Sequence, residues 1–185
     1  HNDDVEMLLP VLRTIMEKYS DVELHLVGEI SIPKELTMFK NRIIFHPFMD
    51  WKILPKLISE VDINLAPLTD TIFNEAKSEN KWVEAALVKV PTIASNVGAF
   101  ARMINHEENG ILCRGPEEWI DAIERLVNDS QYRNKLAEEA YRFCKKKCVT
   151  LYQSQNIRSI IEETATPNVM FVLPSLQISG GIRVA

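Results

Sequence analysis

The sequence is poor in glycine and cysteine and has no long apolar run. Its 185 residues include six glycines, with neither a Gly-x-Gly-x-x-Gly pattern nor the Gly-Lys-Ser/Thr pattern of a P-loop. No apolar run approaches the length of a membrane span, and the N-terminal HNDDVEMLL lacks a signal-peptide pattern. The net charge is −5, and the only basic run is Lys145-Lys146-Lys147, which argues against a nucleic-acid partner.

The three cysteines give no sign of a disulfide framework or a zinc site. Cys144 and Cys148 are one helical turn apart, but no second pair of ligands is near them in the sequence, and Cys113 is left over. Reduced thiols in a cytoplasmic protein are the simplest interpretation, and we expect no metal. The hydrophobic share of 46% and the charged share of 25% are those of an ordinary folded domain.

Helical and strand patterns alternate along the chain. Residues 3–19 have the apolar period of a helix, which Asp3 or Asp4 could cap, and Pro10 predicts a kink or a later start. Strands are predicted at 22–28, 42–48, 62–68, 90–95 and 109–113, with helices at 51–61, from about 78, at 116–129, at 130–148 and at 150–164. Apolar strands separated by helices indicate an α/β fold, a doubly wound parallel sheet covered on both faces.

Both ends of the chain look incomplete for such a fold. The sequence starts at His1 in an apparent loop-to-helix junction, where a first strand would be expected. Near the end, NVMFVLPSLQISGGIRVA reads as a fresh strand followed by a Gly180-Gly181 loop. We therefore expect one domain over residues 1–163, a linker and the opening of a truncated second α/β domain over 164–185, and a longer parent protein.

Ligands of doubly wound sheets bind beyond the carboxyl ends of the strands. Three such ends carry suggestive residues: Gly28 and Glu29 after one strand, the polar loop LAPLTDTIFNEAKSEN after another, and Gly98 in IASNVGAF after a third. Glycine lets backbone approach a ligand closely. The sequence therefore places a candidate site at this edge.

The stretch FNEAKSENKWVEAALVKVPTIAS carries the most specific chemistry. Lys77, Lys81 and Glu84 are spaced i, i+4 and i+7, which places them on one side of a helix that begins near Ser78. The free N–H groups and the dipole of that helix start suit a phosphate, and the two lysines add charge. Glu84 has the lone pairs to accept hydrogen bonds from two neighbouring sugar hydroxyls. This pattern suits a diphosphate and a ribose.

A plainer interpretation is a solvated stripe in which Lys81 and Glu84 form a surface pair worth roughly 0.2–0.5 kcal/mol. Other candidates also have plain explanations. His25 and His46 fit core or edge positions in strands, His106 fits an exposed loop, and Trp51, Trp82 and Trp119 fit core packing better than base stacking.

Several segments together resemble a known family. LHLVGE, RIIFHPF, LPKLISEVDINLAPL, NEAKSENKWVEAALVKVPTIASNVGAF and NHEENGILC occur in the order found in retaining glycosyltransferases of the GT-B fold, the group 1 (family 4) class. The resemblance covers residues 1 to about 147 and is most specific from Asp62 to Ser95. It implies the C-terminal, nucleotide-sugar-binding domain, a Rossmann-like half of a GT-B enzyme.

The resemblance also implies roles for individual residues. Glu84, seven residues before Pro91, corresponds to the glutamate that holds the ribose hydroxyls. The diphosphate would lie at Lys77, Ser78 and Glu79, with Lys81 and Gly28 contributing.

A second family glutamate, often called catalytic, is replaced here by Ala76, so its neighbours Glu75 and Asn74 are the catalytic candidates. The usual glycine-rich stretch is replaced by KSEN, as in a variant branch with N-x-x-K-S-x-x-K-x-x-E.

The implied function is transfer of a sugar from a nucleoside diphosphate to a saccharide or lipid-linked acceptor, in polysaccharide or cell-surface glycan synthesis. No cofactor is expected, and the acceptor would bind through a missing N-terminal domain, so this chain alone should not transfer sugar. The tail resembles the start of a second transferase module. Peripheral membrane association of the full-length protein and oligomer formation through the C-terminal strand stay open.

Two alternatives belong to other classes. One is a degenerate, non-catalytic GT-B module that serves binding or assembly. The other is a GT-B epimerase, for which the sequence shows no acid–base residues.

Overall fold

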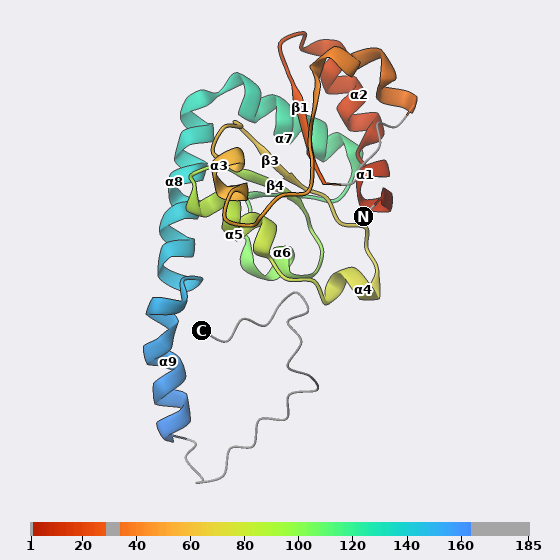
Figure 1. Cartoon of the computed structure of the whole chain (residues 1–185). Helices are drawn as coiled ribbons and strands as arrows, with labels where there is room; N and C mark the ends of the chain where they lie inside the picture. Colours follow the sequence, from red (N-terminus) through yellow and green to blue (C-terminus); the bar gives the residue numbers. More distant parts are fainter. Residues whose placement is uncertain (1, 29–33, 164–185) are drawn as a thin grey trace. The chain divides into compact units, whose positions relative to one another are not determined.

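The computed structural model describes residues 2–28 and 34–163 (Figure 1). The chain divides into two compact units, residues 1–149 and residues 150–185. The predicted linker and strand at 164–185 lie outside the described residues, so their organisation stays a prediction.

The first unit alternates strands and helices (Figure 1). In chain order the elements are α1 (Asn2–Glu6), α2 (Leu9–Lys18), β1 (Leu24–Val27), the 3-10 helix η1 (Lys34–Arg42), β2 (Ile43–His46), α3 (Leu54–Ile58), β3 (Asn64–Ala66), α4 (Ile72–Glu75), α5 (Asn80–Leu87), β4 (Thr92–Ser95), α6 (Gly98–Met103), β5 (Ile111–Cys113), α7 (Pro116–Asn128) and α8 (Ser130–Lys147). The second unit contributes α9 (Thr150–Glu163).

The strand pairs within residues 2–28 and 34–163 are all parallel. β1 pairs with β2, with Leu26 opposite Phe45, and β4 lies between β3 and β5, with Ile93 opposite Ile111. Within the described residues no ladder joins β1 to β3. Parallel strands linked by helices bear out the predicted doubly wound α/β class, although the ladder is divided into a pair and a triplet.

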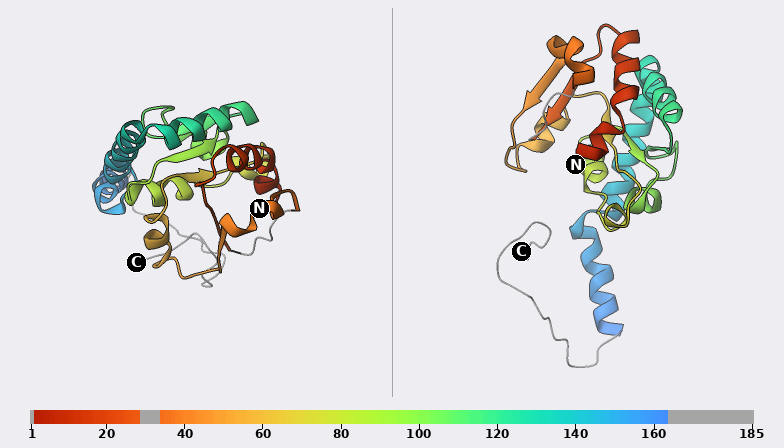
Figure 2. Two further views of the ribbon diagram at one scale, coloured as in Figure 1. Left: turned by 90° about the horizontal axis from the view of Figure 1, so that it is seen from above. Right: turned by 90° about the vertical axis from the view of Figure 1, so that its right-hand side faces the viewer.

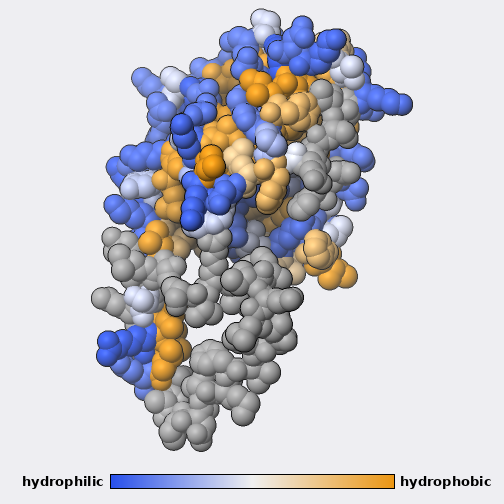
Figure 3. Space-filling view, viewed as in Figure 1, coloured by the Kyte–Doolittle hydropathy of each residue, from blue (hydrophilic) through white to orange (hydrophobic). Residues whose placement is uncertain are grey.

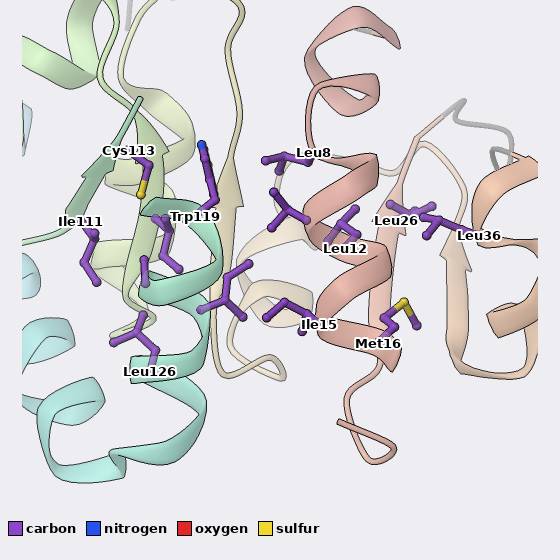
Figure 4. Close-up of a cluster of buried hydrophobic side chains, with 14 of the residues drawn as sticks. Leu8, Leu12, Ile15, Met16, Leu26, Leu36, Ile111, Cys113, Trp119 and Leu126 are labelled. Atoms are coloured by element: carbon purple, nitrogen blue, oxygen red, sulfur yellow. The ribbon is translucent and has the colours of Figure 1, made fainter. Parts of the chain in front are cut away.

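The three-stranded sheet is covered on both faces, because side chains alternate along each strand. Ile93 points to α2 and α7, whereas the next residue, Ala94, points to α5, α6 and α8. Figure 2 shows these helices on opposite sides of the strands. In Figure 4, Leu12 and Ile15 of α2 lie between the α7 residues Trp119 and Leu126 on one side and the neighbourhood of β1 on the other. One helix thus packs against residues from both sheets.

Most predicted elements are confirmed, with exceptions at the N-terminus and in the loops. The helix predicted at 3–19 is broken at Met7 and Leu8, and Pro10 lies in the first turn of α2, where it removes no needed hydrogen bond. Capping by Asp3 or Asp4 is wrong, since both lie inside the first turn of α1. The helices η1, α4 and α6 were not predicted.

Two side-chain interpretations also change. Trp82 and Trp119 are buried as predicted, but Trp51 is 53% exposed, so core packing is wrong there. His106 is exposed as predicted, yet its Nδ1 accepts a hydrogen bond from Leu112 N–H at 3.0 Å and so holds the turn before β5. His25 on β1 and His46 on β2 are hydrogen-bonded to each other, with 3.1 Å between His25 Nδ1 and His46 Nε2.

Helix α9 is amphipathic. Figure 3 shows hydrophobic and hydrophilic residues on different sides of it. The exposed Ile157, Ile160 and Ile161 are spaced i, i+3 and i+4, so they share one side of this helix. In the part of the chain that the structure describes, no helix is both long and apolar enough to cross a bilayer.

Candidate functional site

The loop after β3 forms the centre of the candidate site. It leaves the carboxyl edge of the sheet, where Ser95 at the end of β4 accepts a hydrogen bond from Leu68 N–H at 2.8 Å. Thr71 then caps α4 by accepting from Asn74 N–H at 3.1 Å. These contacts fix the loop above the ends of β3 and β4, where a doubly wound sheet binds its ligands.

A buried carboxylate anchors this loop from the other end of the chain. Asp4 in α1 is only 4% exposed, and its Oδ1 accepts from Thr69 N–H at 2.9 Å, from the Thr69 hydroxyl at 3.1 Å and from Asn74 Nδ2 at 3.1 Å. Burial alone would raise the pKa of Asp4, but the Thr69 hydrogen bonds and Lys77 outweigh it and lower the pKa. Asp4 is therefore an ionised group inside the protein.

Two lysines lie beside this carboxylate. Lys77 Nζ is 3.3 Å from Asp4 Oδ2, and its side chain is 23% exposed. Lys81 is exposed, yet desolvation by surrounding protein lowers its pKa; Asp4 opposes that effect, and Lys77 adds to it. Asp4, Lys77 and Lys81 thus form one electrostatic group.

The predicted helix start is wrong by about one half-turn. Helix α5 begins at Asn80, with Glu79 in the capping position, because α4 ends at Glu75 and the chain turns before it enters the next helix. Lys77 is therefore in the connecting turn and does not share a helical face with Lys81 and Glu84. Lys77 still lies close enough to Lys81 to lower the pKa of that lysine, and it forms an ion pair with Asp4 at 3.3 Å.

Glu84 is a half-buried carboxylate on α5. Desolvation by burial raises its pKa. Among the described residues no side chain or backbone group donates to it, and Lys81 forms no salt bridge with it despite the i, i+3 spacing. A carboxylate that is partly removed from water without a partner is unfavourable in the empty protein. Donors on a ligand would remove that penalty.

The two catalytic candidates have different surroundings. Asn74 is 4% exposed, and its Nδ2 also donates to Thr69 O at 2.7 Å, so this amide holds the loop. Glu75 is about half exposed; its carboxylate contacts Gly98 N–H and Arg102 Nη1, each at 3.3 Å. Gly98 is required at this junction, because its φ is +56° and an added Cβ would lie 2.9 Å from Asn74 O.

The remaining candidates lie near or along the same edge. Ser78 is exposed, and Glu79 provides no side-chain cap to α5, so the first N–H groups of that helix have no side-chain acceptor among the described residues. Gly28 follows β1 with a φ of +103° and donates its N–H to His46 O at 2.9 Å. It lies at the carboxyl end of the other sheet.

The sequence analysis did not predict that Asp4 belongs to this site. Asp4 looked like a helix cap, and only the fold brings it to Lys77, 73 residues later in the chain. The signal that could have found it is weak: two adjacent acids at the start of an apolar helix. No three His, Cys, Asp or Glu side chains come together as metal ligands in the ranges 2–28 and 34–163.

The sequence of this chain matches a known family over most of its length. The model of glycosyl transferases group 1 covers residues 1–129. The chain belongs to this family. A D-inositol 3-phosphate glycosyltransferase of Paenarthrobacter aurescens is 38% identical over 60 residues, which are 31% of this chain and 15% of that protein.

Solved structures of group 1 and related glycosyltransferases share the fold. The C-terminal domain of the group 1 protein LpcC from Francisella tularensis superposes with a TM-score of 0.62, at 23% identity over 78% of each chain. Anabaena HepE in complex with UDP gives a TM-score of 0.72, at 19% identity over 85% of this chain and 44% of that one. This group 1 chain therefore has the Rossmann-like fold of one half of a GT-B glycosyltransferase and spans less than half of the HepE chain.

Proposed function

We propose that this chain binds the nucleoside diphosphate of a sugar donor at the loop after β3 and at α5. The observation that carries the proposal is Glu84, a half-buried carboxylate with a raised pKa and no partner among the described residues. Two vicinal ribose hydroxyls would donate to its two oxygens and offset its desolvation.

The diphosphate would lie nearer the start of the same helix. Lys77 and Lys81 supply two positive charges there, and the uncapped N–H groups at the beginning of α5 supply donors. Glu84 is one turn beyond Lys81, so ribose and phosphate groups of one nucleotide would meet these residues in order. HepE, which shares the fold, has been solved with UDP, which supports UDP as the first nucleotide to test.

For the whole protein we infer retaining sugar transfer to a saccharide or lipid-linked acceptor in glycan synthesis in the cytoplasm. No metal is needed in this scheme, because Lys77, Lys81 and the helix start would balance the charge of the leaving diphosphate. The acceptor would bind to a second domain, so we expect this chain alone to show no transfer. Of the two catalytic candidates, Glu75 is the accessible one, because its side chain is about half exposed, whereas Asn74 is buried.

Calorimetry with UDP, GDP and ADP tests the proposal. Losing a hydrogen bond to a charged group costs about 1.5–3 kcal/mol, so Glu84→Gln should weaken binding of the preferred nucleotide roughly 10- to 100-fold. Glu60→Gln is the matched control, since it removes the same charge from an exposed position. Equal affinity for wild type and Glu84→Gln would establish Glu84 as part of a solvated stripe. Nucleotide binding without transfer by the full-length protein would favour the non-catalytic alternative.

A further inference from the structure

Asp4 lies behind the proposed phosphate site and reaches it from a distant part of the sequence. We propose that Asp4 is a positioning residue that holds Lys77, and the loop that carries it, in place for the diphosphate. This inference rests on the proposed nucleotide site and adds a residue to it that would not touch the ligand.

The two oxygens of Asp4 have different contacts. Oδ1 receives the hydrogen bonds from Thr69 and Asn74, and Oδ2 faces Lys77 Nζ at 3.3 Å. The carboxylate is thus oriented by the start of the loop and in turn orients the lysine at its end. Fixing one carboxylate fixes both ends of the 69–77 segment.

A lysine needs such an anchor more than an arginine would. Its ammonium is a compact charge on a flexible four-carbon stem and loses considerable rotamer entropy when a ligand orders it. Lys77 is already restrained by Asp4, and its Nζ lies 5.3 Å above the Phe73 ring centroid. Part of the ordering is therefore completed before a diphosphate arrives.

Charge alone predicts the opposite effect of Asp4. A carboxylate close to an anion site repels the anion, and Asp4 also neutralises part of the charge on Lys77. If repulsion dominated, removing the charge of Asp4 would strengthen diphosphate binding. If positioning dominates, the same change weakens it. The two explanations therefore differ in sign.

The experiment is a double-mutant cycle with Asp4→Asn, Lys77→Gln and the double variant, each titrated with UDP and with uridine. Asp4→Asn should weaken UDP binding roughly tenfold, about the effect of one hydrogen bond to a charged group, and leave uridine binding unchanged. In the Lys77→Gln background Asp4→Asn should have no further effect, because its action passes through Lys77. A purely structural role would weaken uridine and UDP alike.

Thr69→Val is a second probe, because it removes the hydroxyl that donates to Asp4 and accepts from Asn74 Nδ2, and it changes no charge. We expect a smaller loss of UDP affinity, roughly threefold, with uridine again unchanged. If Asp4→Asn does not fold, this variant carries the test, and unchanged UDP affinity in it overturns the inference. Tighter UDP binding by Asp4→Asn, or an equal loss in the Lys77→Gln background, also overturns it. A wild-type chain that binds no nucleoside diphosphate defeats the proposed function itself.

Discussion

The two faces of α5 differ in how completely their polar groups are satisfied. On the buried face, Trp82 is fully buried beside Ala85 and Ala86, and its Nε1 donates to Asn109 O at 2.9 Å. On the open face, Lys81 and Glu84 have no hydrogen-bond partner for their side chains among the described residues. On the buried face, folding supplies the hydrogen-bond partner of the polar group, whereas on the open face a ligand would supply the partners of the side chains.

The pKa shifts express the same difference. Desolvation lowers the pKa of Lys81 and raises the pKa of Glu84, so the charged form of each is disfavoured in the empty protein. Their charges do not cancel in a salt bridge, although their spacing would permit one. Perturbed groups at the carboxyl edge of a doubly wound sheet are typical of binding sites.

The largest expected effect is a loss of stability from a change on the buried face of α5. Trp82→Ala should lower the free energy of unfolding by about 3–5 kcal/mol, because it removes a buried indole that packs on Phe143 and leaves Asn109 O without its donor. Trp51→Ala is the matched control; its indole is 53% exposed, and the change should stay within about 0.5 kcal/mol. Urea denaturation followed by circular dichroism measures both, and similar losses would contradict the contrast.

The buried face of α5 could be predicted from the sequence, because its apolar residues recur with a regular period. Ala85, Ala86 and the strand after them form a continuous apolar pattern, and such patterns identify helices and buried strands without knowledge of long-range contacts. The same reasoning identified Trp119 on α7 and the five strands of the described residues. The prediction that Trp51 is buried is wrong, because an isolated aromatic residue is not part of a periodic apolar pattern.

The open face of α5 could be predicted from the sequence only in part. Lys81 and Glu84 share α5, so their spacing was enough to bring them together. The position of Lys77 depends on where α4 ends and α5 begins, and a four-residue helix has too few residues to show a period. Asp4 depends on the tertiary fold, which places α1 beside the loop after β3. Local patterns contain no such information.

A second, smaller effect concerns the open face of α5 and is measured as UDP affinity. Lys77→Ala and Lys81→Ala should each weaken UDP binding roughly tenfold and leave uridine binding nearly unchanged, because only the diphosphate needs their charge. The loss should be greater at low salt, where electrostatic attraction is less screened. Lys56→Ala, an exposed lysine of α3, is the control. Equal losses for uridine and UDP would show that these lysines act on the fold rather than on phosphate.

The smallest effect is the pH dependence of stability at Glu84. Because burial raises the pKa of Glu84 in the folded state, ionisation is harder there than in the unfolded chain. Below the ordinary glutamate pKa both states are protonated and there is no penalty; the penalty appears as the pH rises through the folded-state pKa. Glu84→Gln should therefore be slightly more stable than wild type at pH 7, by roughly 0.5 kcal/mol or less, and equally stable near pH 3.

The sign of that small difference should reverse when the nucleotide is present. Saturating UDP stabilises whichever variant binds it more tightly, so wild type should then unfold at the higher urea concentration at pH 7. Glu60→Gln should not show the reversal, since that exposed carboxylate lies outside the proposed nucleotide site. If Glu84→Gln and wild type instead keep the same stability at every pH and with UDP, the open face of α5 would be no more than solvated surface.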